Sequence, residues 1–194
     1  MNKKIAGISV SLLVIIAVFT SIGFIRRVGS GEEFSDERAY RAEIPPEDID
    51  YIDIEDAPVA MDPSGTENYA ELRSKAYDAF TIMNNVRAAN DMESLIWSYE
   101  LELCANQRVN EVAYYFNKNH LRPNGLSWYT VNRGVMRGEN IYKGKKNAVE
   151  AMDSWLNNDV DRENFLCEDF KTAAIAVSRD AKGEYFWVAA FGGE

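Results

Sequence analysis

An uncharged segment at residues 5–25 constrains this chain more than any other feature of its sequence. At 1.5 Å per helical residue, a segment of this length spans a hydrocarbon core about 30 Å thick. Two lysines precede it and two arginines follow it, so the flanking charges do not fix its orientation. A cleaved signal peptide has a shorter apolar region that ends at small residues. We therefore predict an uncleaved transmembrane anchor within residues 1–28 that exports the rest of the chain, with a signal peptide and secretion after cleavage as the alternative.

The next segment, residues 29–66, is acidic and contains four of the five prolines of the chain. Residues 29–70 hold thirteen acidic side chains against two arginines. Such a self-repelling, proline-punctuated sequence tends to be extended and solvated. We predict that it links the membrane to a folded domain at residues 67–194. The net charge of −10 argues against nucleic-acid binding, which depends on Lys and Arg neutralising phosphates.

The spacing of apolar residues in the C-terminal part predicts helices first and strands last. The first helix follows residues 64–67, Ser-Gly-Thr-Glu, which have the spacing of a capping box. A second helix is predicted after Trp97 with Ser98 as its cap, and a third over residues 147–157. This order predicts an α+β fold built on an antiparallel sheet. Strands are expected over residues 138–142, 172–178 and 185–191.

Several short motifs, in order, resemble the bacterial branch of the CAP superfamily, the SCP-like proteins (cysteine-rich secretory proteins, antigen 5 and pathogenesis-related 1). The motifs are MNNVRA at residues 83–88, LIW at 95–97, HLRPNG at 120–125, GENI at 138–141, RENFL at 162–166 and YFWV at 185–188. The resemblance implies a three-layered α/β/α sandwich with a small, mainly antiparallel sheet and a concave cleft. In that family, two histidines and one or two glutamates line the cleft, and some members bind zinc or another divalent metal there.

Half of that tetrad is present in this sequence. His120 and Glu139 match the family's motifs, whereas Asp161 stands at the position of the second histidine. Asn158 stands where eukaryotic members have a second glutamate. The resemblance therefore implies a ligand-binding cleft formed by His120, Glu139, Asp161, Asn158 and Arg122, with a degenerate His/Glu set.

The same residues have two further interpretations. His120, Glu139 and Asp161 are a candidate metal set, because imidazole and carboxylate both bind divalent ions. A carboxylate in place of an imidazole weakens zinc binding and shifts the preference toward manganese or calcium. Alternatively, the residues are structural: His120 is bonded to Glu139, Glu139 is paired with Arg122 or Arg162, and Asp161 caps the short helix that follows it.

Two functions follow from these interpretations. We predict an extracytoplasmic module at the cell envelope that binds a small apolar or glycan ligand, or an envelope protein. The family resemblance implies no established catalytic cycle, and a divalent metal is the one candidate cofactor. The alternative is a metal-dependent hydrolase that uses His120, Glu139 and Asp161. A serine nucleophile elbow is missing from the sequence, and the single histidine has its own role. Outside the cytoplasm Cys104 and Cys167 can form a disulfide, or Cys104 can be a buried apolar residue, and the sequence leaves both open.

Overall fold

The computed structural model describes residues 59–193 of the chain. The predicted anchor at residues 5–25, and the linker up to residue 58, lie outside the described residues. Within residues 59–193, the structure contains no helix that has both the length and the apolar character to cross a membrane.

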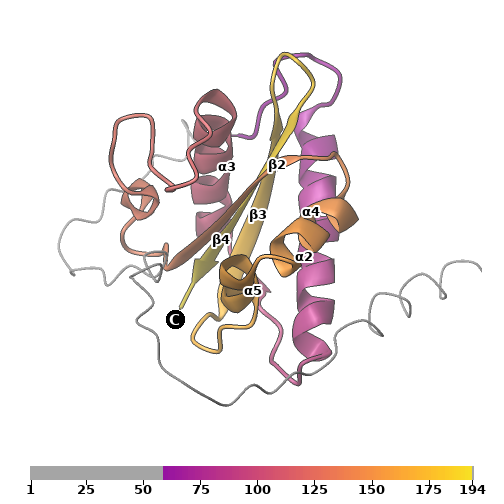
Figure 1. Cartoon of the computed structure of the whole chain (residues 1–194), viewed down its shortest axis with the longest axis vertical. Helices are drawn as coiled ribbons and strands as arrows, with labels where there is room; N and C mark the ends of the chain where they lie inside the picture. Colours follow the sequence, from indigo (N-terminus) through magenta and orange to yellow (C-terminus); the bar gives the residue numbers. More distant parts are fainter. Residues whose placement is uncertain (1–58, 194) are drawn as a thin grey trace, which may run out of the picture. The chain divides into compact units, whose positions relative to one another are not determined.

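A four-stranded mixed sheet lies at the centre of the described part (Figure 1). Its strands run in the order β1-β3-β4-β2, with β1 parallel to β3 and the other two pairs antiparallel. The sheet is therefore mainly antiparallel, as predicted. The strands are β1 (Ile96–Trp97), β2 (Gly138–Gly144), β3 (Thr172–Arg179) and β4 (Tyr185–Gly192).

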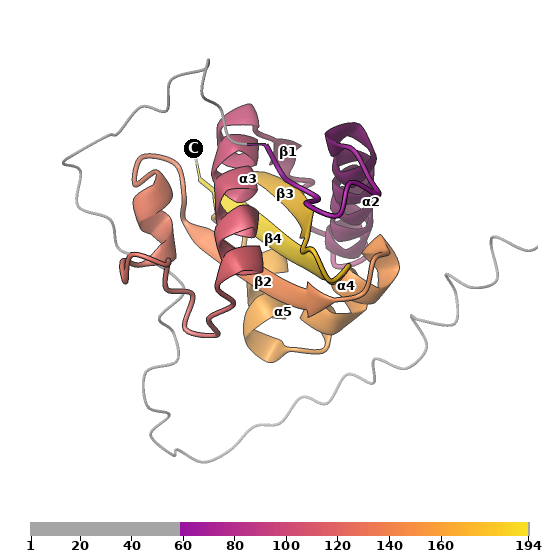
Figure 2. The same ribbon diagram turned by 90° about the horizontal axis from the view of Figure 1, so that it is seen from above.

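Helices cover both faces of this sheet. Helix α3 packs on one face, and α2, α4 and α5 pack on the other (Figures 1 and 2). Strand β4 is buried along its whole length, as expected for an apolar strand that is covered on both sides. The predicted α+β fold with helices on both sides of a small sheet is thus observed. The helices are α2 (Tyr69–Ala88), α3 (Tyr99–Tyr114), the 3-10 helix η2 (Trp128–Val131), α4 (Ala148–Leu156) and α5 (Asp159–Phe165).

The cap of α2 differs from the prediction. Ser98 caps α3 as expected, but α2 begins after a capping box formed by Asn68 and Glu71 rather than by residues 64–67. The carboxylate of Asp62 explains the difference, because it accepts hydrogen bonds from the backbone of Ser64 and of the residues that follow. These bonds hold that segment in a turn, so the helix starts one turn later.

The last residues of the predicted linker, 59–66, pack against the folded domain. The carbonyl of Met61 accepts a hydrogen bond of 2.7 Å from the hydroxyl of Ser178 on β3. On α3, the amide of Asn110 donates to the carbonyl of Val59 at 2.7 Å and accepts from the backbone N–H of Met61 at 3.1 Å. The folded part therefore begins before the predicted boundary at residue 67.

The described residues contain no disulfide between Cys104 and Cys167. Cys104 lies on α3 and is fully buried in the core. Burial raises the pKa of its thiol to about 12, since the thiolate loses its hydration. Cys104 therefore behaves as a small apolar side chain, which was one of the two interpretations of the sequence.

Candidate functional site

His120 and Glu139 meet in the structure, as the family resemblance implies. The imidazole Nδ1 of His120 lies 2.9 Å from Oε1 of Glu139. Glu139 is carried by β2, and His120 by the loop that follows α3. The backbone of His120 has a φ of 58°, in the left-handed region that few non-glycine residues adopt.

Arg108 on α3 holds the other side of the Glu139 carboxylate. Its Nε donates to Oε2 at 2.7 Å, and its Nη2 donates to Oε1 at 3.1 Å. Burial alone would raise the pKa of Glu139, but Arg108 and His120 outweigh it and hold the pKa below its usual value. Glu139 is therefore ionised and can only accept, so the Nδ1 of His120 carries the proton in their hydrogen bond.

The charged network continues beyond this pair. Nη1 of Arg108 donates to Glu111 at 2.6 Å, and Arg122 donates to the same carboxylate through Nε and Nη2. Arg122 thus lies at the far end of the network and is connected to Glu139 only through Glu111 and Arg108. The predicted pairing of Glu139 with Arg122 or Arg162 is wrong, because Arg108 takes both of its oxygens.

Arg108 was not among the predicted site residues, although it lies on the buried side of α3 with Leu101 and Cys104. That position was the available signal, because a buried arginine needs an acceptor. The exposed fraction of Arg108 is 1%. Glu111 lies three residues further along the same helix, which brings the two side chains together. The acceptor that neutralises most of the charge, Glu139, is distant in sequence and could not be identified this way.

Asp161 lies on α5, close enough to His120 for their charges to interact. Burial raises the pKa of its carboxyl to about 6, and the attraction of His120 offsets only part of this rise. No hydrogen bond or ion pair reaches its carboxylate from the described residues. The backbone of Asp161 is fixed, because its carbonyl accepts a bond of 2.9 Å from the side chain of Asn140 on β2. Asp161 is therefore a half-buried carboxylate whose oxygens have no donor from residues 59–193.

Asn158 is the N-cap residue of α5. Its side-chain oxygen accepts from the backbone N–H groups of Val160 and Asp161 at 3.0 and 3.1 Å, and so caps α5. The prediction that Asp161 caps this helix is wrong, because α5 begins at Asp159, before Asp161. The shift frees the Asp161 side chain from a capping role.

The three predicted metal ligands do not fit a divalent ion. Within residues 59–193, no group of three or more His, Cys, Asp or Glu side chains is arranged to hold a metal. Both oxygens of Glu139 bind the guanidinium of Arg108, so a metal on this carboxylate would have to approach a buried positive charge. Glu139 therefore orients His120 rather than serving as a ligand with Asp161.

Comparison with known proteins identifies the family of this chain. The model of the cysteine-rich secretory protein family (CAP) matches residues 80–191. No curated protein matches the sequence. An outer surface protein of Borrelia burgdorferi has a similar structure, with a TM-score of 0.56 at 13% identity, over 63% of this chain and 94% of that one.

A second solved structure agrees with this assignment. It is an extracellular protein containing an SCP domain from Bacillus anthracis, with a TM-score of 0.53 at 19% identity. The match covers 67% of this chain and 45% of that one, so this chain spans less than half of that protein. The family model spans more than half of this chain, and the predicted family is thereby confirmed. The chain belongs to the cysteine-rich secretory protein (CAP) family.

Proposed function

We propose that this chain is an extracytoplasmic interaction module that binds a basic group of an envelope protein through His120 and Asp161. The observation that carries the proposal is the Asp161 carboxylate, which is half-buried and has no hydrogen-bond donor from the described residues. A desolvated carboxylate without a donor costs free energy, and a ligand that supplies an N–H group recovers that cost. A guanidinium or ammonium group supplies both the donor and the opposite charge.

The geometry favours binding over hydrolysis. A general base must reach the substrate and have a pKa near the working pH. Glu139 has an exposed fraction of 1%, a lowered pKa and two occupied oxygens, so it meets neither requirement. Its effect is to fix the orientation of the His120 ring. Of these two carboxylates, that of Asp161 is the one available to an incoming group.

The extracytoplasmic location is supported by the uncharged segment at residues 5–25 and the acidic linker that follows it. The names of the two similar proteins describe one as an outer surface protein and the other as extracellular. Tethering through an uncleaved anchor and secretion after cleavage predict different masses. Mass spectrometry of protein purified from cells should show the intact chain of 22.0 kDa. A species that lacks about the first 20 to 30 residues would show that the apolar segment is cleaved and the protein is secreted.

Binding at Asp161 can be tested by NMR, because the imidazole signals of the single histidine come from the site itself. The full chain in phosphocholine micelles would be titrated with N-acetyl-argininamide at pH 7. We expect saturable shifts of the His120 ring in the wild type and in Asp153→Asn, a change at an exposed position of α4. Asp161→Asn should weaken binding at least five-fold. Equal shifts in Asp161→Asn would overturn the proposal.

The alternative function needs a separate assay. Insoluble cell-wall sacculi would be incubated with the full chain, and soluble fragments would be measured over time. We expect no release above the buffer control, because both oxygens of Glu139 are occupied by Arg108 and no nucleophile among the described residues is hydrogen-bonded to the Asp161 carboxylate. Release that His120→Ala abolishes would establish a hydrolase in place of the interaction module.

A further inference from the structure

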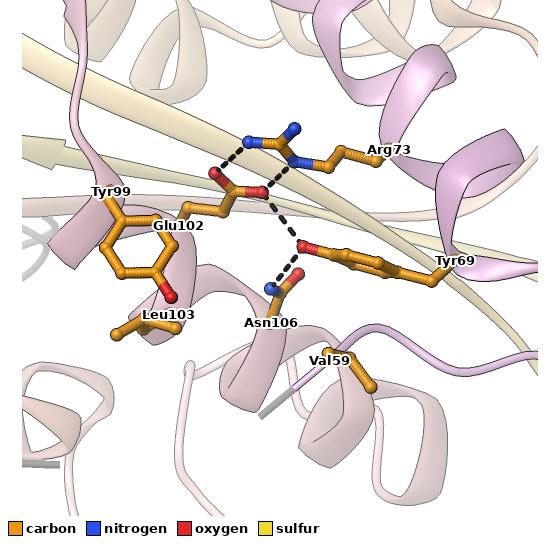
Figure 3. Close-up of a pocket in the computed structure, with 7 residues that line it drawn as sticks. All are labelled: Val59, Tyr69, Arg73, Tyr99, Glu102, Leu103 and Asn106. Atoms are coloured by element: carbon orange, nitrogen blue, oxygen red, sulfur yellow. Dashed lines mark hydrogen bonds and ion pairs between the residues drawn. The ribbon is translucent and has the colours of Figure 1, made fainter. Parts of the chain in front are cut away.

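A hollow lies near the N-terminal ends of α2 and α3 and shares no residue with the His120 network (Figure 3). Its volume is about 330 Å³. This value lies near the lower end of the range for small-molecule sites, about 300–1,000 Å³. Side chains of both helices line it, and Val59, from the segment before α2, adds part of the wall.

The polar side of this hollow is built on Glu102, which has an exposed fraction of 2%. Its carboxylate accepts hydrogen bonds from the guanidinium of Arg73, the hydroxyl of Tyr69 and the indole N–H of Trp97. Burial alone would raise the pKa of Glu102, but these donors outweigh it and lower the pKa. The carboxylate is ionised and paired with Arg73, so this side of the hollow has no net charge to select an ion.

Two other polar groups are left for a ligand. The amide of Asn106 donates to the hydroxyl of Tyr69 at 3.2 Å, but its Oδ1 accepts no hydrogen bond from the described residues. Asn106 has an exposed fraction of only 3%, so this acceptor belongs to the hollow and not to the open surface. The hydroxyl of Tyr99 likewise has no partner among the described residues. Figure 3 shows both groups on the same side of Glu102.

The remaining wall is apolar, and its Val59 part is bonded to α3. It consists of Val59, Leu103 and the ring of Tyr99. The carbonyl of Val59 is held at 2.7 Å by the side chain of Asn110, which keeps this wall on the domain. A wall that is ordered before binding lowers the entropic cost of binding.

We propose that this hollow is a binding site for a neutral saccharide of one or two rings. A sugar ring offers an apolar C–H face to Tyr99 and Leu103, and its hydroxyl groups can donate to Asn106 and bond with the Tyr99 hydroxyl. An ionic ligand finds no unpaired counter-charge, because Arg73 and Glu102 neutralise each other. A purely apolar ligand would bury the Asn106 acceptor without a donor, which is unfavourable.

The test uses the full chain in phosphocholine micelles, because detergents with sugar head groups would compete for the site. Cellobiose and N,N′-diacetylchitobiose are the probes, and saturation-transfer NMR measures their affinity. The indole signal of Trp97, which bonds to Glu102, reports binding at the hollow itself. We expect at least one disaccharide to bind with a Kd of about 1 mM and to shift this signal.

Matched variants of α3 separate this site from the surface and from the His120 site. Tyr99→Ala should weaken binding at least five-fold, whereas Tyr114→Ala, at a position that is 86% exposed on the same helix, should leave it unchanged. His120→Ala should also leave it unchanged, so the two proposals fail separately. Absence of binding by both disaccharides up to about 10 mM, or equal binding by Tyr99→Ala, would overturn the saccharide site.

Discussion

Replacing Arg108 by methionine would remove the main counter-charge of the buried Glu139 carboxylate while keeping much of the apolar stem. The change deletes two hydrogen bonds to Glu139, of 2.7 and 3.1 Å, one of 2.6 Å to Glu111, and one of 3.4 Å to the backbone carbonyl of His120. Removing one partner of a buried ion pair costs about 3–5 kcal/mol, because the other charge remains in a poorly hydrated place. A domain of this size has a total stability of about 5–15 kcal/mol. Arg108→Met should therefore lose a large part of its unfolding free energy at pH 7.

Urea unfolding followed by tryptophan fluorescence measures this loss. All four tryptophans of the chain lie within residues 59–193, so the signal comes from the folded domain. The matched control is Arg162→Met, which breaks an ion pair with Asp159 and a hydrogen bond to the carbonyl of Leu156; the side chains of Arg162 and Asp159 are 43% and 83% exposed. Such exposed pairs contribute less than about 1 kcal/mol. The difference between the two variants isolates the effect of burial.

The pH dependence and a double variant complete the test. The folded-state pKa of Glu139 is lowered, so its ionisation stabilises the wild type above the unfolded pKa, and this contribution is lost as the pH falls through the folded value. In Arg108→Met the carboxyl loses its guanidinium and is protonated more easily, so the penalty should shrink in acid. Adding Glu139→Gln should recover most of the lost stability at pH 7. A cost no larger than that of Arg162→Met, or no recovery in the double variant, would show that the buried Arg108–Glu139 pair does not stabilise the domain.

Three further predictions concern Asp161, Gly138 and Cys104. The pKa of Asp161 is raised from 3.8 to about 6 on folding, so the free energy of unfolding should fall as the pH rises through this range. In urea unfolding at pH 7.5, Asp161→Asn should be more stable than the wild type by about 1–2 kcal/mol. A loss of stability in this variant would contradict the prediction. Gly138→Ala would place its Cβ 2.7 Å from the ring of Phe170 and should cost about 1–3 kcal/mol, visible as a lower Tm; an unchanged Tm would speak against the tight packing. Cys104 should resist iodoacetamide at pH 8 until urea is added, as read by mass spectrometry, and rapid native alkylation would contradict its burial.

The sequence predicted the long strands well and the short one not at all. Strands β3 and β4 were expected over residues 172–178 and 185–191, and each is one residue longer in the structure. Their continuous apolar runs and the turn between them are local signals. The two-residue strand β1 has no such signal, because it exists through bonds to the distant backbone carbonyls of Lys171 and Ala173.

In the candidate site too, features set by nearby residues could be predicted, whereas partners distant in the sequence could not. Motif resemblance brought His120 and Glu139 together, and their hydrogen bond agrees with it. The helical spacing of Arg108 from Leu101 and Cys104 indicates a buried face, but such spacing identifies a face and not the partner across it. Aspartate is a good N-cap residue, so local propensity predicted that Asp161 caps the following helix. In the structure, Asn158 caps α5 about one turn earlier. Both outcomes depend on tertiary packing.

The pKa of Asp161 is the measurement that tests the proposed site most directly. It can be followed by carbon NMR of the aspartate carboxyl groups, with Asp161→Asn to identify the signal. We expect the Asp161 carboxyl to have a pKa of about 6 in the unliganded chain, because burial without a donor from the described residues disfavours its charged form. Saturating N-acetyl-argininamide should lower it. A value near 3.8 that does not respond to this cation would contradict the claim that Asp161 is a desolvated acceptor for a partner's basic group.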